Sequence, residues 1–81
     1  MTYPDVDTEV SGYVAAICYD IAGAAQPLIT LPGRHDTFDA ARRRAQRIAS
    51  AIIAAGDVGV SGWVTYSGER PAGLPRNGVR V

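Results

Sequence analysis

The chain has 81 residues, 47% of them apolar, and a formal net charge of zero. This length is that of one domain, and this composition suffices for one hydrophobic core and excludes a disordered chain. The balanced charge argues against a nucleic-acid or membrane binder that works through bulk charge. We expect a cytoplasmic protein: there is one cysteine, no signal-peptide pattern and no run of the ~18 apolar residues that a spanning helix needs.

The first nine residues differ in composition from the rest of the chain. They hold three of the eight acidic side chains and a proline, so we expect them to form a flexible acidic arm. Residues 10–81 should then form a single α+β domain. Within it, residues 70–81 are rich in proline and glycine and could form a loop-like tail.

A first strand is expected over residues 10–21, which are rich in β-branched and aromatic side chains. Both faces of this strand are apolar, as is typical of a central strand covered on both sides. The alternation therefore does not decide which face meets the rest of the core. After a turn over residues 20–25, residues 28–31 should form a second strand, antiparallel to the first because the connection is short.

A long helix is expected over residues 37–55. Asp36 or Thr37 can cap its N-terminus, and Gly56 can end it in a left-handed conformation. One apolar stripe follows the helical period through Phe38, Ala41, Ala45, Ile48, Ile52 and Ala55. Because this stripe is largely alanine, we expect the helix to approach the sheet closely.

Residues 58–66 should form a third strand, because they alternate between apolar and polar side chains. Val58, Val60, Val64 and Tyr66 point to one face, which we expect to meet the helix, and Ser61, Trp63 and Thr65 point to the other. Residues 79–81 could add a short fourth strand at the edge. The predicted fold is thus α+β: a small antiparallel sheet in the order β-β-α-β, packed on one face by a single long helix.

No pattern in the chain indicates catalysis or a bound cofactor. One histidine, His35, and one cysteine, Cys18, cannot assemble a tetrahedral metal site within one chain. Neither a nucleophile elbow nor a glycine-rich phosphate loop is present. We therefore expect a protein that is not an enzyme and that has no cofactor or metal.

The candidate binding residues are aromatic and basic. Trp63 should lie on the sheet face away from the helix, and if Tyr13 and Tyr19 share that face they form an aromatic patch with it. Alternatively, the tail after Pro71 folds back over Trp63. On the helix, Arg43 and Arg47 are four residues apart and share one side, where they are either solvated or a secondary polar patch.

The motif around the start of the predicted helix resembles one family. Leu31-Pro32-Gly33, then Asp36-Thr37, then Ala41 and Ala45, resemble the strand–loop–helix of HicB-type antitoxins, which are small α+β domains that pair with a toxin. The size, the composition and the lack of catalytic motifs are also similar to those of small phage or mobile-element accessory proteins, including anti-CRISPR inhibitors, which occupy a partner's surface.

These features lead to two hypotheses. The first is a non-enzymatic protein-binding module, an inhibitor or antitoxin-like accessory protein that acts by surface occlusion and uses Tyr13, Tyr19, Trp63, Arg43 and Arg47. The alternative is a nucleic-acid-binding domain that stacks bases on the aromatic sheet face. The expected partner is another protein, or a second copy of the chain in a homodimer that covers the open sheet face, and not a membrane.

Overall fold

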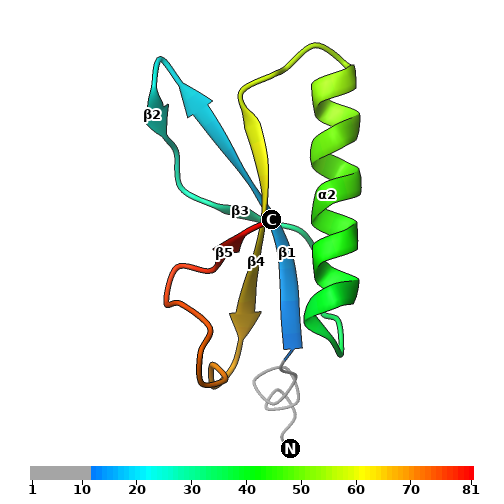
Figure 1. Cartoon of the computed structure of the whole chain (residues 1–81), viewed down its shortest axis with the longest axis vertical. Helices are drawn as coiled ribbons and strands as arrows, with labels where there is room; N and C mark the ends of the chain where they lie inside the picture. The colour runs from blue at the N-terminus through cyan, green and yellow to red at the C-terminus, as the bar shows by residue number, and fades with distance from the viewer. Residues whose placement is uncertain (1–11) are drawn as a thin grey trace, which may run out of the picture.

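The computed structural model describes residues 12–81, and the predicted acidic arm at residues 1–9 lies outside them. This part of the chain forms strands β1 (Gly12–Ile21), β2 (Ala24–Ala25) and β3 (Ile29–Thr30), helix α2 (Phe38–Ala54), and strands β4 (Val60–Ser67) and β5 (Val79–Arg80). The helix packs against one side of a curled antiparallel sheet (Figure 1). The predicted α+β class with one long helix is confirmed.

Strand β1 lies in the centre of the sheet. On one side it pairs with β4 through eight residue pairs, from Gly12 and Ser67 to Tyr19 and Val60. On its other side it pairs with β3 at its middle and with β2 at its end. Strand β5 pairs with the outer edge of β4. The prediction of a central first strand is therefore confirmed, and residues 79–80 do form a short edge strand.

The segment after β1 is more regular than predicted. Strand β1 continues to Ile21, and a two-residue turn at Ala22 and Gly23 leads directly into β2. Both turn residues have positive φ angles, 54° and 85°, as the tight turns of two-residue hairpins require. The predicted second strand over residues 28–31 shortens to Ile29–Thr30 in β3.

Val58 does not face the helix, contrary to the prediction, and is 80% exposed. It lies in a turn in which the Asp57 carboxylate accepts a hydrogen bond from the Gly59 N–H at 3.3 Å. The backbone of Gly59 is already against β1, since the N–H of Asp20 donates to its carbonyl at 2.6 Å. Strand β4 begins only at Val60. The apolar alternation in the sequence therefore begins two residues before the strand, at Val58 in the turn.

Helix α2 has the ends that the sequence predicts. The Thr37 hydroxyl caps its N-terminus by accepting a hydrogen bond from the N–H of Ala40 at 3.1 Å. Gly56 follows the helix at a φ of 113°, which an L-residue with a side chain rarely adopts. The buried side of the helix differs from the predicted apolar stripe near the C-terminus, because Ala49 is buried and Ala55 is exposed.

The expected close approach of helix and sheet is confirmed at Gly62. A Cβ atom on Gly62 would lie 3.0 Å from the carbonyl oxygen of Ala45, so only a glycine fits there without displacing the helix backbone. The core between the two layers has Ile17, Ala49 and Val60 at its centre, with Tyr19, Ile48 and Ile52 packed around them. The predicted packing of Ile48 and Ile52 on this side of β4 is therefore confirmed.

Candidate binding surface

The sheet has a second face, on the side opposite α2. The β1–β4 register pairs Val14 with Thr65, Ala16 with Trp63, and Cys18 with Ser61, and strand alternation directs these six side chains away from the helix. The three β1 residues are buried, whereas the three β4 residues are half-buried. No helix of residues 12–81 covers this face (Figure 1).

Two segments rise beside this face and make it a trough. The segment of residues 25–34, which contains β3, forms the wall on the side of β1, and the segment of residues 67–77 borders the trough on the side of β4 through Ser67, Arg76 and Asn77. Figure 1 shows both segments on the side of the sheet away from α2. We call this surface the open-face trough, with Val14, Cys18, Trp63 and Thr65 as its floor.

The trough contains two adjoining hollows. The first, of about 540 Å³, is predominantly apolar and is lined by Cys18, Ala25, Gln26, Pro27, Leu28, Thr30, Trp63, Thr65, Arg76 and Asn77. The second, of about 410 Å³, is lined by Val14, Thr30, Leu31, Pro32, Gly33, Arg34, Thr65, Tyr66 and Ser67. Thr30 and Thr65 border both hollows, so one extended chain segment could run through the two.

The indole ring of Trp63 is held in a defined orientation. Its Nε1–H donates to the Ser61 hydroxyl at 2.9 Å, and that hydroxyl donates in turn to the carbonyl of Cys18 at 3.5 Å. The polar edge of the ring is therefore satisfied within the sheet. The rest of the ring is available for apolar contact with a ligand in the first hollow.

The tail borders the trough rather than closing it. Val79 and Arg80 pair with the outer edge of β4, and the N–H of Val81 donates to the carbonyl of Gly62 at 2.9 Å. Gly78 is buried against β4 at a φ of 89°, where a Cβ would lie 2.6 Å from the carbonyl oxygen of Val64. These contacts place the tail along the edge of the sheet and leave Trp63 half-buried.

Tyr13 and Tyr19 do not share the face of Trp63, so the condition for a three-residue aromatic patch is not met. In the register, Tyr13 pairs with Tyr66 and Tyr19 pairs with Val60, both on the helix side. The Tyr13 ring stands edge-on to Tyr66, with 4.9 Å between the ring centroids. The two sets of alternating side chains in β1 are those that the sequence predicts. Only the pairing of β1 with the distant β4 decides which set faces the helix.

The walls of the trough were not among the predicted site residues. Pro27, Leu28, Arg34 and Arg76 border it because segments far from β4 in the sequence fold alongside the sheet. The sequence does indicate one of the two walls. The short connection after β1 requires the chain to run back antiparallel to β1, which places residues 25–34 beside it. Of the five predicted residues, Trp63 alone lies on the floor of the trough.

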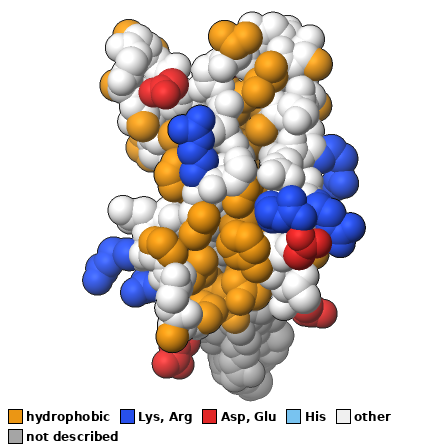
Figure 2. All heavy atoms as spheres, in the orientation of Figure 1, with side chains coloured by type: hydrophobic (Ala, Val, Ile, Leu, Met, Phe, Trp, Pro, Cys, Tyr) orange, Lys and Arg blue, Asp and Glu red, His pale blue; other side chains and the backbone are white. Residues whose placement is uncertain are grey.

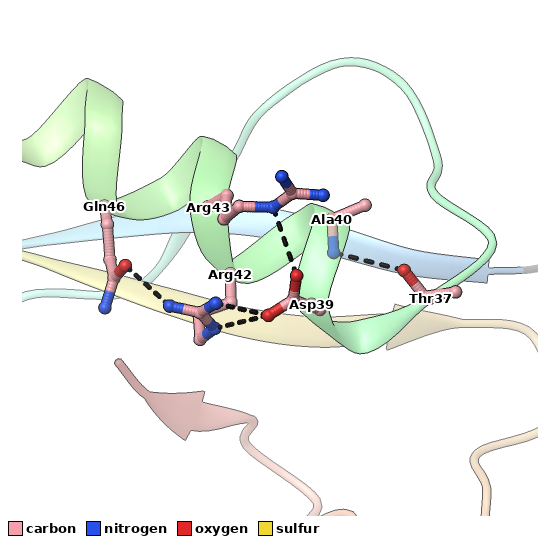
Figure 3. A network of polar contacts seen from close by, with 6 residues as sticks. All are labelled: Thr37, Asp39, Ala40, Arg42, Arg43 and Gln46. Carbon is pink, nitrogen blue, oxygen red and sulfur yellow. Dashed lines mark hydrogen bonds and ion pairs between the residues drawn. The ribbon is translucent and has the colours of Figure 1, made fainter.

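The predicted basic residues lie on the helix, in the other layer. Asp39 binds two arginines: it is 3.1 Å from Arg43 Nε, and it accepts hydrogen bonds from Arg42 (Figure 3). Arg44 donates to a backbone carbonyl before the helix, and Arg47 forms no ion pair within residues 12–81. Arg43 and Arg47 are both exposed on α2, whereas Trp63 lies on the sheet face away from α2.

These arginines lower the pKa of Asp39 below its ordinary value of 3.8, chiefly through the hydrogen bond from Arg42, while lost hydration acts in the opposite direction. We expect Arg42→Gln to raise the pKa of Asp39 in the folded chain more than Arg43→Gln does. The pKa of Asp39 is lower in the folded chain than its ordinary value of 3.8, so its ion pairs contribute their full stabilisation at pH values above 3.8. This stabilisation is lost as the pH falls through the pKa of Asp39 in the folded chain. An NMR titration of the Asp39 carboxyl tests this, and equal effects of the two substitutions would contradict it.

No family model, curated protein or solved structure matches the chain. Across residues 12–81, no helix has both the length and the apolar character needed to cross a membrane. In the same part of the chain, no group of three or more His, Cys, Asp or Glu side chains could hold a metal ion.

Proposed function

We propose that the chain is a non-catalytic protein-binding module that takes an extended segment of a partner protein into the open-face trough. The observation that carries the proposal is the trough itself: an apolar sheet floor opposite the helix, set between two walls, with the Trp63 ring half-exposed in its larger hollow. Clefts of this size, with mostly apolar lining and a few polar groups at the rim, are typical ligand sites.

The composition of the trough supports a peptide ligand. Pro27, Leu28 and Trp63 offer apolar contact, and each Å² of apolar surface removed from water contributes about 25 cal/mol. Trp63 on the floor is the kind of anchor that dominates binding energies in protein interfaces. A partner segment held here is withdrawn from its own interactions, so the proposal includes the role of an inhibitor or antitoxin-like accessory protein that acts by occlusion.

The nucleic-acid alternative has less support. Binding of successive bases relies on several aromatic rings along one surface. Trp63 is the only one of the three predicted aromatic residues on the open face, since Tyr13 and Tyr19 pack on the helix side. The arginines of the helix are also in the layer away from the trough.

A matched pair of phenylalanine substitutions tests the proposal. Thr65 borders both hollows, so Thr65→Phe should fill the trough, whereas Ala54→Phe adds the same side chain at an exposed position of α2. Peptides selected from a random library on the unmodified chain should lose binding to Thr65→Phe and keep it to Ala54→Phe. They should also shift the NMR signals of Trp63 and Leu28. Selected peptides that bind both variants equally would contradict the proposal.

A homodimer would use the same surface in another way, because a second copy could cover the trough by a self-complementary contact. Sedimentation velocity at increasing concentration separates the two cases. If the chain dimerises and Thr65→Phe abolishes the dimer while Ala54→Phe does not, the occupant of the trough is a second copy and not a partner segment.

A further inference from the structure

We infer that the segment bound in the open-face trough is acidic: an extended peptide in which carboxylates flank an apolar side chain. This inference rests on the proposed function and specifies its ligand. It starts from the distribution of charge. All eight basic residues but only five of the eight acidic residues lie in residues 12–81, which gives this part of the chain a formal charge of +3.

The charged residues that line the two hollows of the trough are basic, and Glu69, which lies in the segment of residues 67–77, lines neither hollow. Each hollow is lined by one arginine, Arg34 in one and Arg76 in the other, and neither hollow is lined by an acidic residue. Arg80, although it is the cross-strand partner of Trp63, lines a separate hollow beside α2 and not the trough. A ligand that spans both hollows can therefore contact the apolar floor and both arginines.

The arginines that line the trough have no acidic partner within the part of the chain that the structure describes. The ion pairs found there engage only Arg42 and Arg43, both with Asp39, whereas Arg34 and Arg76 form none. Figure 2 shows basic side chains over α2 on the right, next to an acidic side chain, and further basic side chains on the left, where the tail lies. A guanidinium group that has no partner in the fold can form a bidentate pair with a carboxylate of a ligand.

The spacing of the trough suits an extended peptide. Val14 borders the hollow of Arg34 and Cys18 borders the hollow of Arg76, and these two floor residues are four strand positions, or ~13 Å, apart along β1. An extended ligand covers this distance with four or five residues of its own. Carboxylates near its two ends would then reach the two arginines, while an apolar side chain between them contacts Trp63.

A defined pair of synthetic peptides tests the inference on the full chain. The probe is Asp-Val-Asp-Leu-Glu-Val with blocked ends, and its control is the neutral Asn-Val-Asn-Leu-Gln-Val. Binding is followed by the NMR signals of the Trp63 indole and the Thr65 amide. The acidic probe should bind at least about tenfold more tightly than the control, as expected when charge-assisted pairs form with two arginines, and added salt should weaken it.

A matched pair of double substitutions locates the charge effect. Arg34→Gln with Arg76→Gln should remove most of the preference for the acidic probe, whereas Arg43→Gln with Arg47→Gln, at exposed helix positions, should leave it unchanged. Equal loss in both variants would mean that only the overall charge matters and would overturn the inference.

The remaining outcomes separate this inference from the proposed function. If the neutral peptide binds the trough as tightly as the acidic one, the inference fails and the proposed function stands. If neither peptide shifts the signals of Trp63 and Thr65, the inference fails, and the peptides selected from the random library decide the proposed function. If an oligothymidine of equal charge binds these residues more tightly, the ligand is a nucleic acid and the inference is overturned.

One outcome concerns the chain itself, since Asp5, Asp7 and Glu9 lie outside the described residues. These three residues are replaced by Asn, Asn and Gln in a second sample of the full chain. If the acidic probe binds that sample much more tightly, the chain's own acidic residues compete for the arginines. They, and not a partner, would then be the occupant of the trough.

Discussion

Ile17→Ala is expected to lower the free energy of unfolding by about 2–5 kcal/mol, the range for removing a fully packed aliphatic side chain. Ile17 is 6% exposed and lies in the middle of β1, where it contacts the core centre with Ala49 and Val60. The helix residue in this cluster is Ala49, whose single methyl group cannot change rotamer to fill a cavity. Because the total stability of a small domain is only about 5–15 kcal/mol, the variant should lose a large part of it.

Ile21→Ala is the matched control for this prediction. Ile21 lies on the same strand and the same side as Ile17, four residues later, but is 61% exposed. Its replacement should change the free energy of unfolding by no more than about 0.5 kcal/mol, as is usual at the surface. Urea denaturation followed by far-ultraviolet circular dichroism gives both values. Similar midpoints for the two variants would show that the helix and β1 do not form the core at Ile17.

Gly62→Val is expected to destabilise the fold by about 1–3 kcal/mol, the usual cost of overpacking a core. The first added atom would lie 3.0 Å from the carbonyl oxygen and 3.1 Å from the carbonyl carbon of Ala45. These are helix backbone atoms, which cannot rotate away as a side chain can. Valine favours strands, yet here it must displace the backbone of α2 at Ala45.

Thr65→Val is the matched control for Gly62→Val. It places a valine on the same strand, but on the open face, where no helix lies above it. Its midpoint in urea should stay close to that of the unmodified chain, whereas that of Gly62→Val should fall. The prediction would be wrong if Gly62→Val were as stable as Thr65→Val, since the helix would then not be held against β4 at this point.

The elements that could be predicted from the sequence are those set by local patterns. The helix is one, because the cap at Thr37, the alanine stripe and the stop at Gly56 are all within the segment itself. Strand β4 is another, apart from its first residues: nothing local distinguishes Val58, in the turn, from Val60, in the strand. Strands β2 and β3 have two residues each and exist only because β1 lies beside them.

The candidate site could be predicted only in part for the same reason. The alternation of β4 placed Trp63 on the face away from the helix, and the structure confirms that position. In β1 both faces are apolar, so a local pattern cannot assign Tyr13 and Tyr19 to either. The arginines of the helix were conspicuous as a cluster, whereas Arg34 and Arg76 are isolated in loops and are brought to the trough only by the fold.

The central position of β1 also has a consequence for how the chain folds. Its ladder with β4 runs from Gly12 and Ser67 to Tyr19 and Val60, so every pair joins residues more than forty positions apart with the whole helix between them. Helix formation needs only neighbouring residues and takes about a microsecond or less. Closing the chain over the helix must precede any contact in the ladder, and folding rates fall as such non-local contacts dominate. We therefore expect the meeting of β1 and β4, and not the helix, to limit the rate at which this chain reaches its native state.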